Sequence, residues 1–185
     1  FTQFVAEHRY FSLLSFDRGR PCPYHARAMG NPLRVRRPIA ELAAKGQVIE
    51  IAEKIGNFRQ LAGIVEADLA TLEPDKIPDG WRDSVVTGRL EFGFADAQMQ
   101  VASLEGEVQV TLDAVCQRCL EPFRLARSEG LRLLPATVGQ GVATATDFEL
   151  WELDEDLVCP AEIVEEVLIM AMPLSAMHET ADACG

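Results

Sequence analysis

The stretch EVQVTLDA, residues 107–114, alternates polar and apolar side chains at every position. Its valines, leucine and alanine fall on one face of an extended chain, and its charged, amide and hydroxyl side chains fall on the other. A period of two residues is typical of a strand with one buried face. The same alternation occurs upstream in residues 89–94 and 98–101, and downstream from Phe123 toward Leu134. Together these segments predict an antiparallel β-meander that forms a partly closed sheet.

Two other segments show the spacing of amphipathic helices. Between Phe58 and Leu69 the apolar residues recur three and four positions apart, and Asn57 is a candidate N-cap. A second apolar face begins after Pro160 and ends at Pro173. Because the apolar face of a sheet must be covered, we expect an α+β fold in which two main helices pack on the meander.

The remaining segments predict shorter elements and the domain limits. Residues 33–37 and 48–51 have the pattern of strands, and Pro38 and Gly46 bound a short helix. Residues 136–146 are rich in Gly, Ala and Thr, which predicts a loop. Residues 1–28 show no period, so we expect a non-native or disordered N-terminal extension with the natural start at Met29. Residues 29–185 are then a single domain.

Charge is distributed unevenly over the 185 residues, whose formal net charge is −12. Residues 1–40 carry seven arginines against two acidic residues, whereas the rest of the chain has a balance of −17 and no Lys or Arg after Arg132. Such a body repels phosphate backbones, so broad nucleic-acid binding is not expected. The sequence lacks a long apolar run and a convincing export signal, which predicts a cytoplasmic protein.

The tetrapeptide CQRC, residues 116–119, is the most informative motif for chemistry. Two residues between cysteines let both sulfurs approach one ion, and His178 with Cys184 could complete a tetrahedral zinc site. Such a site would fasten the end of the chain to a turn between strands. Two reduced thiols could equally pack at a strand end, or Cys116 and Cys119 could exchange disulfides.

Enzymatic function has little support in the sequence. The chain contains no phosphate-binding glycine loop, dinucleotide fingerprint, nucleophile elbow or paired-histidine zinc-protease helix. A nuclease could use acidic pairs such as Asp154 with Asp156 or Glu165 with Glu166, but neighbouring helix residues do not face one another. We therefore expect a protein that is not an enzyme.

Arginines are the candidate residues for binding a partner. Arg118, Arg124 and Arg127 belong to the only arginine group in the acidic body, and they could contact RNA phosphate or an acidic protein surface. Residues Arg34, Arg36 and Arg37 extend this patch if the first strand lies beside the meander. The alternative is that these side chains are solvated and paired with the many carboxylates nearby.

An ordered set of features resembles the YceD family of large ribosomal RNA subunit accumulation proteins. The features are Gly106, the CQRCLEPF segment at residues 116–123, the acidic and apolar helix that ends in Pro173-Leu174, and then His178 and Cys184. The resemblance covers residues 31–184, and residues 1–28 lie outside it.

The resemblance implies a bacterial, cytoplasmic accessory factor, without catalytic activity, in the synthesis, processing or stability of 23S rRNA. It implies a role in biogenesis of the large ribosomal subunit. The partner could be a large-subunit ribosomal protein, an assembly factor or precursor rRNA. The acidic body favours a basic ribosomal protein over bare RNA, and neither a membrane nor a small-molecule substrate is expected.

Overall fold

The computed structural model describes residues 31–96, 101–137, 147–153, 155–180 and 182–184. The predicted N-terminal extension, residues 98–100 of the meander and most of the predicted loop after Ala136 lie outside these residues. Within them the fold is α+β, as the sequence predicts. The short 3₁₀ turns are η2 (Pro32–Arg34), η3 (Ile55–Asn57), η4 (Pro74–Lys76), η5 (Trp81–Asp83) and η6 (Asp182–Cys184).

A five-stranded sheet forms the body of the molecule. Its order follows the sequence: β2 (Val48–Lys54), β3 (Val85–Phe94), β4 (Ala102–Val115), β5 (Pro122–Thr137) and β6 (Glu149–Leu153). Neighbouring strands from β2 to β5 are antiparallel, which confirms the meander, whereas β6 runs parallel to β5. A separate antiparallel pair joins β1 (Arg37–Pro38) to β7 (Leu157–Val158).

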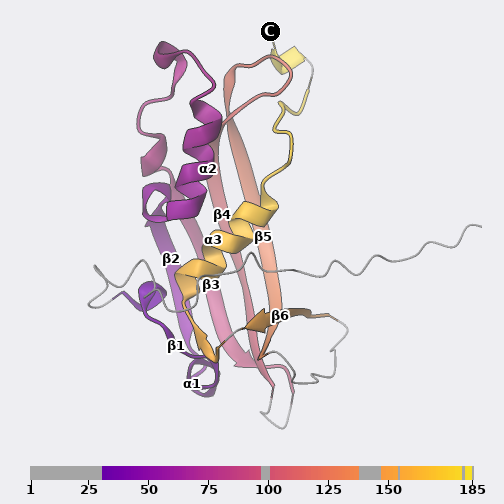
Figure 1. Ribbon diagram of the computed structural model, residues 1–185. Helices are drawn as coiled ribbons and strands as arrows, with labels where there is room; N and C mark the ends of the chain where they lie inside the picture. Colours follow the sequence, from indigo (N-terminus) through magenta and orange to yellow (C-terminus); the bar gives the residue numbers. More distant parts are fainter. Residues whose placement is uncertain (1–30, 97–100, 138–146, 154, 181, 185) are drawn as a thin grey trace, which may run out of the picture.

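Helices cover one face of this sheet (Figure 1). The short α1 (Ile39–Ala44) is followed by Gly46, whose φ of 55° suits a helix end. The two longer helices are α2 (Arg59–Leu69) and α3 (Pro160–Ala171). Both were predicted from their apolar spacing.

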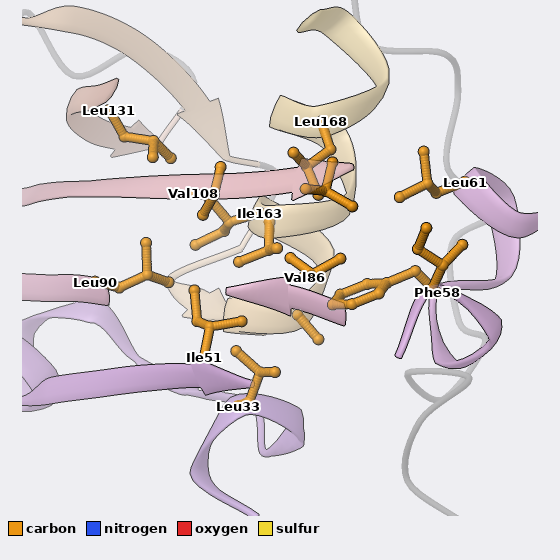
Figure 2. Packing of buried hydrophobic residues seen from close by; sticks show 14 of the residues in the cluster. Leu33, Ile51, Phe58, Leu61, Val86, Leu90, Val108, Leu131, Ile163 and Leu168 are labelled. Carbon is orange, nitrogen blue, oxygen red and sulfur yellow. The ribbon is translucent and has the colours of Figure 1, made fainter. Parts of the chain in front are cut away.

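The core lies between these helices and the sheet (Figure 2). Phe58 and Leu61 at the start of α2 are both 0% exposed, and Ile163 of α3 is 1% exposed. They pack with the inward side chains of the strands, such as Leu90 and Val108. The polar positions that alternate with them, including Glu105, Glu107 and Gln109, are exposed on the opposite face. The period of two thus separates the two faces of the sheet.

Gly106 is needed where β3 and β4 approach closely. It lies opposite Leu90 in the register, and a Cβ at this position would contact the backbone carbonyl oxygen of Arg89. Any side chain would therefore force the two strands apart. The glycine in the family-like set consequently has a structural role in this sheet.

Two carboxylates, one buried and one half-buried, attach α2 to its neighbours. Glu165 of α3 is 4% exposed, and its Oε1 accepts hydrogen bonds from the backbone N–H groups of Gln60 at 2.5 Å and Leu61 at 3.0 Å. At the other end of α2, Oδ2 of Asp68 accepts from the N–H of Val115 at 2.8 Å. The first contact satisfies orphan donors of a helix start, and the second fixes the end of β4, next to Cys116.

Two local expectations were wrong, and one strand was not predicted. Residues 33–37 are not one strand, because the Asn31 side chain accepts from the N–H of Leu33 and begins the η2 turn. Asn57 does not cap α2: its amide donates to Glu53 at 2.7 Å, and Glu165 supplies the acceptor instead. The sequence also gave no sign of β6, whose pattern is interrupted by acidic residues.

No helix in the described part of the chain is long and apolar enough to cross a membrane.

Candidate metal centre

The turn between β4 and β5 carries the first two candidate ligands. Cys116 follows the last residue of β4 and is 0% exposed, and Cys119 is half-buried. The N–H of Leu120 donates to the carbonyl of Cys116 at 2.8 Å, and the N–H of Cys116 donates to the carbonyl of Glu121 at 3.0 Å. These bonds close a compact loop on which both sulfurs are positioned.

The C-terminal segment, residues 173–184, returns past this turn (Figure 1). The N–H of Gln117 donates to the carbonyl of Ala176 at 2.8 Å. The ring of His178 packs on Phe123, with 4.6 Å between ring centroids. These two contacts bring His178 and Cys184 to Cys116 and Cys119, as the sequence predicted.

The four side chains form one cluster. The Sγ atoms of Cys116 and Cys184 are 3.8 Å apart. Nδ1 of His178 lies 3.6 Å from Sγ of Cys119 and 3.4 Å from Sγ of Cys184. All four ligand atoms lie within 4.8 Å of one another, close enough to hold a metal ion.

The pKa of Cys116 is lowered from 9.0 to about 5. Burial raises this pKa, but the backbone hydrogen bonds of Cys119, His178 and Arg118 lower it by more. At Cys119 a backbone hydrogen bond from Glu121 lowers the pKa, whereas burial and the neighbouring sulfurs raise it, and the net shift is upward. A thiolate is the form that binds metal, so the turn prepares at least Cys116 for ligation.

The Arg118 side chain lies beside the cluster and donates hydrogen bonds to it. Its Nε donates to Sγ of Cys184 at 3.0 Å, and its Nη2 donates to the carbonyls of Thr180 at 2.9 Å and His178 at 3.4 Å. The hydrogen bond to Cys184 raises the pKa of Arg118, so the guanidinium remains charged beside the sulfurs. The side chain that was a candidate for partner binding is thus engaged with the C-terminal segment.

The structure does not gather the other candidate arginines around Arg118. Arg124 on β5 donates to Asp113 at 2.9 Å, and Arg127 is half-buried and donates to the carbonyl of Ala126. Arg34 is 8% exposed and pairs with Glu53, Arg36 pairs with Glu162, and Arg37 is half-buried in β1. The β1 strand pairs with β7 rather than with the meander, toward the opposite end of the molecule from the cysteine turn (Figure 1).

The described carboxylates that a nuclease could use are not arranged to hold a metal ion. Asp154 lies outside the described residues, and Glu165 is committed to the start of α2. The pKa of Glu166 is raised, first by burial and then by Glu162. Among the described residues, the cysteine and histidine cluster is the one group of acidic, cysteine or histidine side chains arranged to hold a metal.

The sequence did not indicate Leu120 as a residue of functional interest. It follows Cys119 with a φ of 60°, and its side chain is 64% exposed. A composition pattern gives no sign of such a residue, because left-handed backbone is predicted mainly from Gly or Asn.

Comparison with protein-family models, with curated proteins and with solved structures found no match to this chain. The resemblance to the YceD family therefore stays a prediction from the residues quoted above.

Proposed function

We propose that this protein is a non-enzymatic accessory factor for accumulation of 23S rRNA and the large ribosomal subunit. It works in the bacterial cytoplasm through a large-subunit ribosomal protein, and a structural zinc ion holds its C-terminal segment in place. The rRNA role rests on the family resemblance, and the zinc role rests on the cluster.

One observation supports both the rRNA role and the zinc role. The features that resemble the family are spread over the second half of the sequence, yet four of them meet at one point in space. Cys116 and Cys119 lie on the strand turn, while His178 and Cys184 follow the helix that ends in Pro-Leu, and their ligand atoms lie within 4.8 Å. A set that converges in this way is more specific than the CQRC motif alone.

Three of the separations between ligand atoms are compatible with a tetrahedral zinc ion. A tetrahedral zinc ion, bonded to sulfur at about 2.3 Å and nitrogen at about 2.05 Å, places two sulfurs roughly 3.8 Å apart and a sulfur and a nitrogen roughly 3.6 Å apart. The measured separations are 3.8 Å between Cys116 and Cys184, and 3.6 and 3.4 Å from His178 to Cys119 and Cys184. Three sulfurs and one imidazole are a donor set of structural zinc sites.

The same donor set argues against catalysis by the metal. Catalytic zinc keeps one position for water or substrate, whereas four protein ligands fill a tetrahedral shell. When bound, the ion supplies folding free energy to the segment that carries two of its ligands. The chain's own residues orient that segment: Gln117 and Arg118 bond its backbone, and Phe123 packs on His178.

Depletion of the protein in its own bacterium tests the rRNA role. We expect a selective loss of free large subunits and a lower ratio of 23S to 16S rRNA in sucrose-gradient fractions. Complementation with the wild-type chain should restore the ratio. An unchanged gradient in depleted cells would contradict the proposed role.

Substitution of a ligand tests the zinc role independently. Cys116→Ser should release zinc and sharply lower the melting temperature, because the serine hydroxyl does not replace a thiolate ligand. An unchanged melting curve, with no zinc in the wild-type protein, would exclude the structural site. Fast alkylation of both Cys116 and Cys119 in the purified protein would favour thiol–disulfide exchange instead.

A further inference from the structure

Leu120 has a backbone conformation that a leucine does not favour. Among the described residues other than glycine, it alone has a positive φ, at 60°. This left-handed conformation brings Cβ close to the following carbonyl oxygen, and glycine would adopt it without that cost. The turn after Cys119 therefore requires a conformation for which leucine is a poor choice.

Burial does not compensate for this conformation, because the Leu120 side chain is 64% exposed. A strained residue that gains little from the core is a reason to consider a binding role. Its isobutyl group is held at the surface by a turn whose two cysteines are ligands of the cluster.

Two more exposed apolar side chains come from the segment that meets this turn. Met177, which precedes the ligand His178, is 50% exposed, and Leu174 is fully exposed at 109%. Leu120 is the sequence neighbour of Cys119, and Met177 is the sequence neighbour of His178. The two neighbours are held close together because Sγ of Cys119 is 3.6 Å from Nδ1 of His178. The turn and the segment lie at the same end of the molecule (Figure 1).

The charges at this end are mainly negative. Four exposed carboxylates lie at this end, those of Glu73, Asp75, Glu121 and Glu179, and the first two act on the charge of Lys76. Of the nearby cations, Lys76 pairs with Glu121 at 2.9 Å, and Arg118 is turned toward the C-terminal segment. An apolar surface with acidic neighbours attracts a basic protein segment and repels a phosphate backbone.

We propose that Leu120, Leu174 and Met177 form a docking surface for a basic protein segment that contributes an apolar anchor between Lys or Arg residues. On the proposed function, on which this inference rests, that segment belongs to a large-subunit ribosomal protein. The metal centre fixes the two backbones that carry the surface, and Arg118 donates to the C-terminal segment beside it.

Leu120→Gly separates binding from folding. Glycine suits the left-handed turn and removes the anchor, so this variant should melt no lower than the wild type and should keep its zinc. Met177→Ser is a second variant on the surface. Leu157→Ser is the matched control, because Leu157 is 41% exposed on β7, toward the opposite end.

Binding is measured with the immobilised holoprotein at physiological salt. The probes are proteins extracted from purified large subunits, equally basic proteins from small subunits, and 23S rRNA. We expect the wild type to retain a large-subunit protein selectively. Leu120→Gly should bind that protein at least tenfold more weakly, Met177→Ser should also bind it more weakly, and Leu157→Ser should bind it as the wild type does. Equal retention by Leu120→Gly, equal retention of small-subunit proteins, or binding of the rRNA alone would overturn the inference.

Complementation distinguishes this inference from the function on which it rests. If depletion leaves the ratio of 23S to 16S rRNA unchanged, the proposed function fails. If depletion lowers the ratio and Leu120→Gly restores it fully, the docking surface is wrong while the proposed function stands. The expected result is that Leu157→Ser restores the ratio and Leu120→Gly does not.

Discussion

The core between sheet and helices is stabilised by other interactions than the end of the molecule that carries the candidate metal centre, called the metal end below. In the core, the long side chains of α2, α3 and the inner faces of the strands are almost completely buried. In the C-terminal segment none of the described residues is buried. Sulfur, imidazole, guanidinium and backbone contacts hold that segment. The core should therefore supply most of the global stability, and a bound metal should add to it by holding the segment in place.

Phe58→Ala should produce the largest loss of stability. Phe58 is 0% exposed and packs where α2, α3 and the sheet meet, so the truncation leaves a cavity and should cost about 3–5 kcal/mol in the free energy of unfolding. Urea denaturation measures this loss, and it should be similar with and without bound metal. The milder change Phe58→Leu should cost less. A loss below about 1 kcal/mol for Phe58→Ala would show that the core is not as closely packed as described.

Glu165→Gln should have the next largest effect. The carboxylate accepts two backbone N–H groups at the start of α2, and its loss of charge weakens both bonds, for an expected cost of about 1–2 kcal/mol at pH 7. Glu166→Gln is the matched control on the next residue. Burial and Glu162 raise the pKa of Glu166, so folding disfavours its charged form relative to the unfolded chain and its neutralisation should cost nothing. Equal destabilisation of both variants in urea would contradict this assignment.

Arg118→Gln should affect the metal end and leave the core intact. Without the guanidinium, Cys184 and the carbonyls of His178 and Thr180 lose their donors, so a chelator should remove the metal about tenfold faster. The measurement is release of zinc to a coloured chelator, with the cobalt-substituted absorption spectrum as a second readout of the sulfur ligands. Arg124→Gln, which breaks an ion pair on the sheet, is the control and should release zinc at the wild-type rate. Equal rates of zinc release for the two variants would show that Arg118 does not stabilise the metal centre.

The metal-free protein should have a pH-dependent stability that comes from Cys116. The pKa of Cys116 is about 5 in the folded chain and 9.0 ordinarily, so between these values the unfolded chain binds a proton that the folded chain does not. Stability from this group should rise from pH 5 to 9 and be lost as the pH falls toward 5. Melting curves of reduced, chelator-treated wild type and Cys116→Ala give this contribution as a difference. A constant difference over that range would contradict the lowered pKa.

The sequence predicted what depends on local periodicity. Alternation at residues 107–114 placed the meander, and the spacing of apolar residues placed α2 and α3. Contacts between distant segments were harder to predict. Asn57 has the chemistry of a cap, but Glu165, more than a hundred residues away, provides the acceptor. The parallel pairing of β6 also depends on a partner that its own sequence does not indicate.

In the candidate site, too, some residues could be predicted from local sequence and others could not. Ligand type and the gap of two residues indicated Cys116 and Cys119, and the need of tetrahedral zinc for two more ligands added His178 and Cys184. Nothing local shows whether an arginine faces solvent or the chain, so Arg118 was a candidate for a partner although its donors contact the C-terminal segment. Leu120 went unnoticed because its distinguishing feature is a backbone angle.

The metal content of the purified protein tests most directly whether a zinc ion fastens the C-terminal segment to the turn between β4 and β5. Protein purified without chelator is analysed by mass spectrometry of its elements, beside Cys184→Ser and the control Cys159→Ala, whose cysteine lies at the start of α3. We predict one zinc ion per chain in the wild type and in Cys159→Ala, and much less in Cys184→Ser. A wild-type protein that neither contains zinc nor binds added zinc, or a Cys184→Ser variant that retains it fully, would contradict the account.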